Sequence, residues 1–265
     1  MQRLTDPCCP RCTHTPSTPC VRFVDCRTEG PLCHDDPACR ARRDELKAAA
    51  LRLTPDRPVV TIGTGTCGRG AGAMKVLDAI RAWAQAGGHP VRVEETGCIG
   101  LCTAEPLMDI QVPGRARLFY GNVRPNQVAR LLEAVIGRGE AAPRSLGQLA
   151  VDGASSWDGV ADLWAHPFFA PQNRRVLTRR GTTDPASLDA YLAEGGFRAF
   201  SRAVSSLTPA EVIAEVETSG LRGRGGGGFP TGHKWRFAQD APADQKYMIC
   251  NADEGDPGAF MDRAV

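Results

Sequence analysis

The chain has 265 residues, 42% of them hydrophobic and 23% charged, and its 32 basic and 30 acidic side chains leave a net charge of +2. This length suits two modest domains, and the balanced charge gives no reason to expect a nucleic acid as a partner. Because no apolar stretch approaches the roughly 20 residues of a membrane helix, and the N-terminus lacks the apolar core of a secretory signal, we expect a cytoplasmic protein with no membrane span.

Cysteine is concentrated at the N-terminus, in a segment that we delimit as residues 1–54. Seven of the eleven cysteines lie within the first 39 residues, and clustered thiols in a reducing compartment are more often metal or iron–sulfur ligands than disulfides. With too few large apolar residues for a core, this segment is predicted to be an irregular metal-binding extension. Its candidate ligands are Cys9, Cys12, Cys33 and Cys39. Zinc and iron–sulfur chemistry both fit the spacing, and a disordered thiol-rich tail is the alternative.

A helix is predicted at the end of this extension. Asp36 is a favoured N-cap residue, and Pro37 suits the first turn of a helix. The helix would run through residues 41–53 and stop before Pro55.

The next stretch, which we delimit as residues 55–139, has the pattern of a compact α/β unit. Apolar or alternating runs predict four strands, and helical spacing of apolar residues predicts two helices, in the order β-α-β-β-β-α. The strands are expected at residues 58–63, 89–96, 106–112 and 115–120, and the helices at residues 73–85 and 125–136. Residues 140–190 are weakly patterned and are predicted to be a linker that wraps over a surface.

Residues 191–265 are predicted to begin a further domain. Thr208 and Glu211 form a capping box at the start of a helix. A short helix at residues 234–240 and a strand at residues 246–253 would follow. Because these elements do not close a domain, we expect the chain to be a fragment.

A run of glycines stands between the two predicted helices, in the stretch GLRGRGGGGFPTGHKW. It matches G-x-G-x-x-G, but a helix precedes it where a dinucleotide-binding fold would have a strand, and a flexible linker is the alternative. Arg222 and Arg224 place positive charge beside bare backbone amides, as an anion-binding loop requires. Phe229 and Pro230 stiffen the exit of the loop, which favours a binding loop over a linker.

A second signal is the acidic turn in CNADEGDPGAF, which follows the predicted strand directly. The carboxyl end of a strand is where α/β folds hold ligands, although such residues also make ordinary solvated turns. The side chains able to accept hydrogen bonds from a ligand are those of Asn251, Asp253, Glu254 and Asp256.

Together these two motifs resemble the NADH/FMN-binding (51 kDa-type) subunit family of complex I, NAD-linked hydrogenases and formate dehydrogenases. The resemblance covers residues 219–264, and the four glycines with EGDPGAFMDR resemble the hydrogenase and formate dehydrogenase branch. It implies a Rossmann-like FMN-binding domain, of which this chain carries only the start. The fold class expected for the whole chain is therefore α/β.

The resemblance also implies roles for individual residues. The loop would wrap the FMN phosphate through Gly223, Arg224, Gly225 and Gly226. Phe229 and Phe237 would stack on the nicotinamide nucleotide, and Lys234 would lie between flavin and nucleotide. In the acidic turn, the isoalloxazine and ribityl groups would be held by Asn251, Asp253 and Glu254, and the nicotinamide would face Asp256.

The activity implied is transfer of a hydride between NAD(H) and FMN, with single electrons passing to iron–sulfur clusters in other subunits of a multisubunit complex. A [4Fe–4S] cluster would belong to a later part of the family's sequence, so this fragment alone is expected to be inactive. The flavin carries the chemistry, and we assign no catalytic residue. The alternative is a non-enzymatic metal- or iron–sulfur-binding scaffold that no longer binds flavin.

Residues 57–137 resemble a thioredoxin-like [2Fe–2S] ferredoxin domain. The resemblance rests on GTCGRGAGA, on the C-x3-C pair in TGCIGLC, on Glu105-Pro106 and on the order of elements. A [2Fe–2S] cluster takes four thiolates, but only Cys67, Cys98 and Cys102 are present. We expect a domain that keeps its fold as a docking module. The alternative is an intact cluster, completed by a cysteine from the N-terminal extension.

Overall fold

A computed structural model describes residues 21–30, 36–51, 55–88, 90–151, 153–175, 184 and 186–247, together with residues 249, 251, 253 and 255. Several predicted ligands lie outside the described residues. These are Cys9, Cys12, Cys33, Glu254 and Asp256. Within the described part, none of the helices has the length and apolar character needed to cross a membrane.

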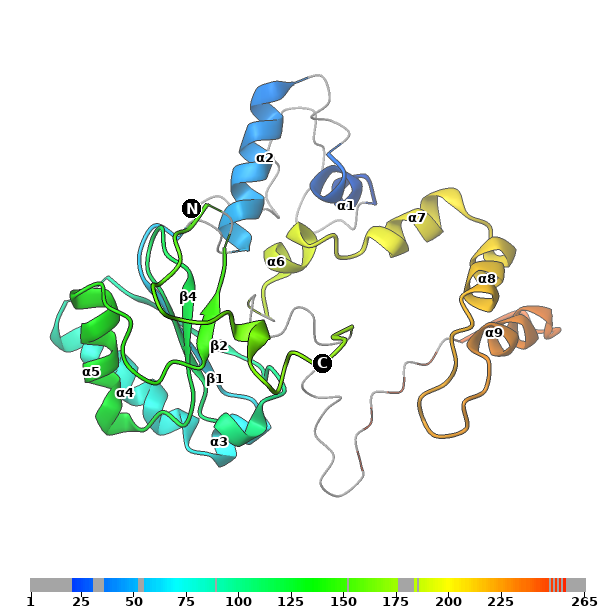
Figure 1. Cartoon of the computed structure of the whole chain (residues 1–265). Helices are drawn as coiled ribbons and strands as arrows, with labels where there is room; N and C mark the ends of the chain where they lie inside the picture. The colour runs from blue at the N-terminus through cyan, green and yellow to red at the C-terminus, as the bar shows by residue number, and fades with distance from the viewer. Residues whose placement is uncertain are drawn as a thin grey trace.

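A five-stranded mixed sheet lies at one side of the molecule, at the left of Figure 1. The strands are β1 (Val59–Gly63), β2 (Arg92–Thr96), β3 (Met108–Gln111), β4 (Arg117–Tyr120) and β5 (Gly147–Leu149). Their order is β2-β1-β3-β4-β5, with β1 and β2 parallel and the other neighbours antiparallel. The order of elements predicted for residues 55–139 is confirmed, and the chain has the expected α/β fold.

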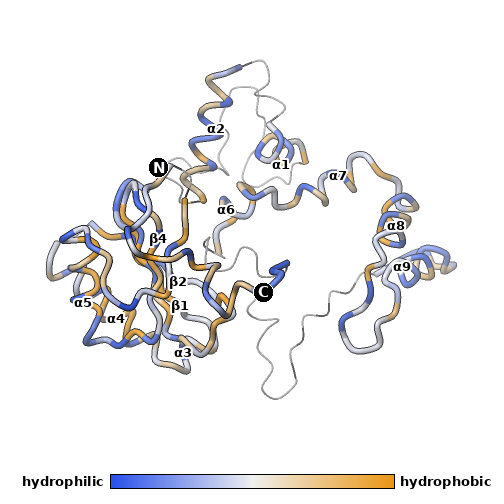
Figure 2. Tube along the Cα trace, viewed as in Figure 1, coloured by the Kyte–Doolittle hydropathy of each residue, from blue (hydrophilic) through white to orange (hydrophobic). Residues whose placement is uncertain are grey.

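Two helices, α4 (Ala73–Ala86) and α5 (Pro125–Leu132), pack together and cover one face of this sheet. Leu118 and Tyr120 of β4 point into the core beneath these helices, whereas Phe119 belongs to a second buried cluster. This alternation is the period of two that a strand imposes. Figure 2 shows hydrophobic residues gathered along the strands. A buried ion pair joins β3 to β4. Arg117 Nε donates to Asp109 Oδ1 at 3.1 Å, and Arg117 Nη2 donates to Asp109 Oδ2 at 2.8 Å.

The segment after residue 139 contributes to the same unit, although it was predicted as a linker. Its strand β5 pairs with β4, and the side-chain amide of Gln148 hydrogen-bonds the backbone of Trp157 and Val160. Trp157 Nε1 donates to the carbonyl of Ala116 at 2.7 Å. A three-residue strand is too short to show a periodic pattern, so only its pairing with β4 reveals it.

The N-terminal extension contains two helices, α1 (Val21–Thr28) and α2 (Pro37–Ala50). The predicted cap of α2 is confirmed, because the Asp36 carboxylate accepts hydrogen bonds from the backbone N–H groups of Ala38 and Cys39. The expectation that this extension lacks a core is wrong for α1. Phe23 packs with Leu192 in a small cluster, which Leu46 of α2 and the distant Ala193 also join.

Leu192 and Ala193 belong to α6 (Leu188–Ala193), which follows the sheet in sequence and precedes α7 (Arg198–Ser206). Ser201 of α7 donates a hydrogen bond to the Asp25 carboxylate of α1, and Arg198 pairs with Glu29. The remaining elements are the helices α3 (Thr66–Gly70), α8 (Pro209–Thr218) and α9 (Thr231–Asp240), the short helical turns η2 (Cys102–Ala104) and η4 (Leu163–Ala165), and the π turn η3 (Glu133–Gly137).

The predicted strand at residues 246–253 is wrong for the residues that are described there. Tyr247 and Ile249 are not in a strand, and their side chains are 82% and 84% exposed. A strand needs a neighbouring strand to pair its backbone groups. Among the described residues, the sheet does not extend to this segment.

Candidate functional site

The helices α8 and α9 frame the glycine run. The predicted capping box at the start of α8 is confirmed, with Glu211 N donating to the Thr208 hydroxyl and Thr208 N donating to the Glu211 carboxylate at 2.7 Å. Gly220, at a φ of +66°, ends the helix in the left-handed conformation that glycine adopts without strain. The predicted short helix is confirmed as α9, which begins three residues earlier than expected, at Thr231.

Close packing holds α8 against α9. A Cβ on Gly232 would come within 2.8 Å of the backbone nitrogen of Glu217, so only glycine allows this approach. Arg236 of α9 clasps the Glu217 carboxylate with two hydrogen bonds, of 2.9 and 2.7 Å. The two ends of the glycine run are therefore held by a packed helix pair.

The base of the glycine run is a hydrogen-bonded hairpin. Gly223 N donates to the carbonyl of Phe229, and Thr231 N donates to the carbonyl of Leu221, each at 2.9 Å. The Arg222 guanidinium donates to the carbonyl of Gly228 at 3.1 Å. With its ends tied in this way, the run is a short built loop, which argues against a slack linker.

The tip of this loop is open. A Cβ on any of the residues 225–228 would meet no other atom within 4 Å. Gly226 has a φ of +102° and Gly228 a φ of +59°, which turn the backbone sharply. Exposed Arg224 and Lys234 flank this open backbone, and Lys234 lies in the first turn of α9, where the helix dipole favours an anion. The loop has the chemistry of a phosphate cradle.

Two aromatic rings lie next to the loop. Phe229 and Phe237 are 47% and 65% exposed, and their ring centroids are 6.4 Å apart. These rings offer a flat apolar surface beside the cradle. The structure thus brings the loop residues, Lys234, Phe229 and Phe237 together on one hairpin.

The acidic turn is not brought to this hairpin by any interaction of its described residues. Asp253 N donates to the side-chain oxygen of Asn251 at 2.9 Å, which is a local turn, and both side chains are exposed. Their assignment to the flavin ring stays a prediction.

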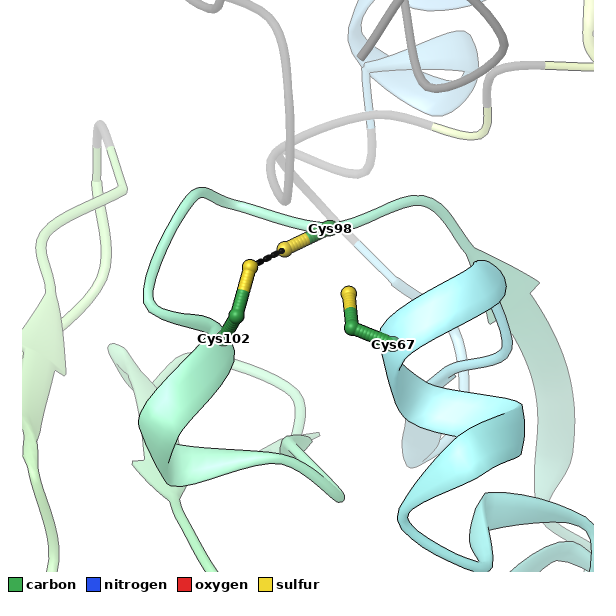
Figure 3. A group of neighbouring side chains, drawn as sticks. All are labelled: Cys67, Cys98 and Cys102. Atoms are coloured by element: carbon green, nitrogen blue, oxygen red, sulfur yellow. Dashed lines mark hydrogen bonds between the residues drawn. The ribbon is translucent and has the colours of Figure 1, made fainter. Parts of the chain in front are cut away.

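A cluster of three cysteines lies at one end of the sheet (Figure 3). Cys67 stands in the first turn of α3, Cys98 follows β2, and Cys102 begins η2. The Sγ atoms of Cys98 and Cys102 are 3.5 Å apart, and all three sulfurs lie within 4.8 Å of one another. The expected trio of ligands is thus brought together, although Cys67 is far from the other two in sequence. Cys39 is in α2, where its thiol lies 3.3 Å from the Asp36 carboxylate.

Tight packing under α3 fixes the position of Cys67. A Cβ on Gly68 would come within 2.2 Å of the Gly63 carbonyl oxygen, so glycine lets the helix lie directly on the end of β1. The Glu105 carboxyl group is buried there, accepts a hydrogen bond from Leu107 N at 2.8 Å, and has its other oxygen 4.0 Å from Cys67 Sγ.

Burial dominates the electrostatics of this cluster. It raises the pKa of the Cys67 and Cys98 thiols and of the Glu105 carboxyl group, while a hydrogen bond from Gly100 N to Cys98 Sγ at 3.2 Å opposes part of the rise for Cys98. Thiols in such surroundings keep their protons until a cation replaces them. Three converging sulfurs are soft ligands of the kind that iron and zinc centres use.

The described residues do not complete a four-thiolate [2Fe–2S] site. Such a cluster takes two thiolates on each iron, whereas Cys67, Cys98 and Cys102 form a single close group that no fourth described cysteine joins.

One charged residue that no sequence pattern indicated stacks on two rings of the buried cluster to which Ile99 and Leu101 also belong. The Arg174 guanidinium lies 4.4 Å above the Trp164 ring and 5.5 Å from that of Phe169. It falls in the stretch predicted as a linker, and no local pattern indicates which ring or loop it contacts.

Comparison with known proteins identifies the segment that carries the glycine loop. Residues 216–265 match the model of the Nuo51 FMN-binding domain. This segment is thus similar to the 51 kDa-type family. The expectation drawn from the two motifs is confirmed, and the matched segment includes the whole loop and α9.

Several curated proteins are similar over part of the chain. The NADP-reducing hydrogenase subunit HndC of Solidesulfovibrio fructosivorans is 59% identical over 92 residues, which are 34% of this chain and 18% of that protein. An NADH-quinone oxidoreductase subunit of Rhizobium meliloti is 53% identical over 90 residues, 34% of this chain and 21% of that protein. The NAD-reducing hydrogenase HoxS subunit alpha of Cupriavidus necator is 36% identical over 172 residues, 64% of this chain and 25% of that protein. The chain thus spans about a quarter or less of these relatives.

Two kinds of solved structure are similar. A thioredoxin-like [2Fe–2S] ferredoxin from Aquifex aeolicus has a TM-score of 0.31 at 18% identity, over 37% of this chain and 98% of that chain. An NAD+-reducing [NiFe]-hydrogenase in the air-oxidised state has a TM-score of 0.32 at 24% identity, over 92% of this chain and 40% of that chain.

Proposed function

We propose that this chain is part of a flavoprotein subunit that transfers a hydride between NAD(H) and FMN and passes single electrons to iron–sulfur clusters. It would act in a multisubunit oxidoreductase of the hydrogenase or formate dehydrogenase type, in the cytoplasm. NADH oxidation and NAD+ reduction are the two directions of the same reaction.

One observation carries this proposal: the segment that matches an FMN-binding domain is also the segment that forms a pinned glycine hairpin with an open, cationic tip. A family match alone would fit a degenerate copy of the domain. A loop whose ends are fixed by hydrogen bonds, and whose open tip can admit a phosphate, still has the geometry that phosphate binding requires.

The relatives favour the hydrogenase branch over complex I. The similarity to the NAD-reducing hydrogenase subunit of Cupriavidus necator extends over 172 residues, well beyond the matched segment at residues 216–265. It therefore includes residues outside the glycine hairpin. Other iron–sulfur subunits are the partners that this branch implies.

The roles proposed for the hairpin are those that the family resemblance implies, and its open tip and exposed side chains support them. Backbone N–H groups of the loop, together with Arg224, would bind the FMN phosphate, and exposed Phe229 and Phe237 would stack on the nicotinamide nucleotide. Lys234 would place a positive charge between the two cofactors. FMN, when bound, supplies the change from two-electron to one-electron transfer. In the acidic turn, the flavin ring and nicotinamide would be held by Asn251, Asp253, Glu254 and Asp256.

A non-enzymatic metal-binding scaffold is the second candidate. The observation that favours it is the cysteine cluster, which can hold a metal without any flavin. The two candidates differ in colour: a flavoprotein has a visible flavin band that NADH bleaches, and a zinc scaffold has none.

The first test uses the full-length protein in its complex, purified without oxygen. We expect a flavin band that NADH bleaches, and we expect Lys234→Ala to abolish this bleaching while flavin content and fold persist. Lys75→Ala is the matched control, because Lys75 is an exposed lysine on α4 of the sheet unit. A colourless protein would contradict the proposed function, and unchanged bleaching in Lys234→Ala would contradict the role of Lys234.

A further inference from the structure

We propose that Cys67, Cys98 and Cys102 bind one divalent metal ion of the zinc class, whose excess negative charge is offset by Arg174. This site is independent of flavin and nucleotide, so it goes beyond the proposed oxidoreductase function. The class of ligand is a soft divalent cation that prefers thiolates in a tetrahedral arrangement.

The spacing of the sulfurs fits one ion. Zinc–thiolate bonds of about 2.3 Å place the sulfurs around a tetrahedral centre about 3.8 Å apart. Here the Cys98 and Cys102 sulfurs are 3.5 Å apart, and every pair in the cluster lies within 4.8 Å. In a two-iron cluster each iron takes two thiolates, and bridging sulfides lie between the irons. Of any three of its cysteine ligands, one would therefore bind a different iron and lie farther from the other two.

The fourth position of this tetrahedron is left for a small external ligand such as water. Among the described residues, no histidine or carboxylate joins the three sulfurs within the same 4.8 Å. Glu105 comes nearest, with its Oε1 4.0 Å from Cys67 Sγ and its Oε2 accepting the hydrogen bond from Leu107 N. Three protein ligands and an open position are typical of reactive zinc sites, whereas structural sites are closed by four.

The charge of such a site needs compensation. Three thiolates and one divalent cation sum to −1, and of the three cysteines Cys98 is buried while Cys67 and Cys102 are half-buried. Opposite charges attract strongly where water is excluded. A fixed cation beside the cysteines would therefore stabilise the loaded site.

Arg174 is held where it can act as that cation. Its guanidinium stacks on Trp164 and Phe169, and the two rings meet edge to face at 5.1 Å. Phe169 in turn belongs to the buried cluster that contains Ile99 and Leu101, which lie in the loop between Cys98 and Cys102. Aromatic stacking thus fixes the cation beside the loop.

The test is a metal analysis of the full chain, made by loading the reduced metal-free protein with Zn²⁺ or Co²⁺ alone. We expect Cys98→Ala to lose one equivalent of metal relative to the unmodified chain, together with part of the tetrahedral cobalt–thiolate absorption. Cys26→Ala is the control, because Cys26 is buried in α1, away from the cluster. Any metal bound by the N-terminal cysteines is present in both the Cys98→Ala variant and the unmodified chain, so it cancels when their metal contents are subtracted.

Arg174 is tested separately, because a role through charge should change affinity and leave the ligands alone. We expect Arg174→Gln to raise the Kd for Zn²⁺ at this site about tenfold, as loss of an outer-shell partner does, with an unchanged cobalt spectrum. Arg175→Gln removes the same charge from the exposed neighbouring position and should change neither.

Two results would overturn the proposal. In the first, Cys98→Ala isolated without oxygen lacks two irons and the acid-labile sulfide that the unmodified chain, isolated in the same way, contains. This loss would indicate a two-iron cluster. The other is a metal content that neither Cys67→Ala nor Cys98→Ala reduces. Equal Zn²⁺ affinity in Arg174→Gln and the unmodified chain would remove Arg174 from the site.

Discussion

At the scale of single residues, two glycines of the α8–α9 hairpin meet opposite surroundings. Gly232 lies where α9 touches the backbone of α8, and a Cβ there would meet Glu217 at 2.5–2.9 Å. Gly225 lies at the open tip, where a Cβ would meet nothing within 4 Å. Glycine is thus needed at one position for packing, and at the other it keeps free the space in which we place a phosphate.

This contrast predicts different effects for the two alanine variants. Gly225→Ala should change the free energy of unfolding by no more than about 0.5 kcal/mol, yet weaken FMN binding, because its methyl group enters the cradle. Gly232→Ala should lower both the melting temperature and the FMN affinity, because it forces α8 and α9 apart. Thermal melts and FMN titrations of the full-length apoprotein measure both effects. Unchanged FMN affinity in Gly225→Ala would contradict the phosphate cradle.

At the scale of elements, the helix that precedes the loop is stabilised at its start by its own side chains. The Thr208–Glu211 capping box satisfies two backbone N–H groups that the first turn leaves unpaired. The hydrogen bond from Thr208 N, followed by that from the Thr208 hydroxyl, lowers the pKa of Glu211 below its ordinary value of 4.5. The start of α8 is therefore sensitive to acid.

The capping box predicts how the stability of α8 depends on pH. Because the folded pKa of Glu211 is lowered, its contribution is complete above pH 4.5 and is lost as the pH falls through the lowered value. Thr208→Ala should destabilise α8 by about 1 kcal/mol and reduce this acid sensitivity. Hydrogen-exchange protection of the α8 amides measures both effects. Thr218→Ala, at the other end of the helix, is the matched control and should leave the acid sensitivity intact.

At the scale of the whole molecule, the N-terminal extension is attached to helices that follow the sheet in sequence. Phe23 and Leu192 share a small buried cluster, and Ser201 and Asp25 join α7 to α1. In the sequence, the strands of the sheet lie between these two groups of residues. The contact therefore joins a segment that precedes the sheet to one that follows it (Figure 1). This contact holds α1 in place against α6 and α7.

The contact predicts a local effect of truncating Phe23. Phe23→Ala should remove about 3 kcal/mol from this small cluster and so expose residues 21–50 to limited proteolysis, while the melting of the sheet unit is unchanged. Phe200→Ala is the control, since Phe200 of α7 is 62% exposed. If the two variants are cleaved equally fast, α1 is not held by Phe23.

Local signals determined a large part of this structure. Apolar periodicity, the Asp36 cap and the Thr208–Glu211 box predict most helices and the first four strands, because these signals act between residues a few positions apart. The motif around the glycine run identified the family from the sequence. The strand predicted at residues 246–253 is wrong for the residues described there, because a strand depends on a pairing partner that no local pattern supplies.

The tertiary structure alone decided which distant groups meet. The three-residue strand β5, the cluster of Phe23 with Leu192, and the stacking of Arg174 beside the cysteine loop all depend on contacts that no local pattern announces. The sequence named Cys67, Cys98 and Cys102 as ligands, but only the fold placed their sulfurs within 4.8 Å of one another as a single group. Periodicity and capping are properties of neighbouring residues, whereas the geometry of a metal site is set by packing across the whole domain.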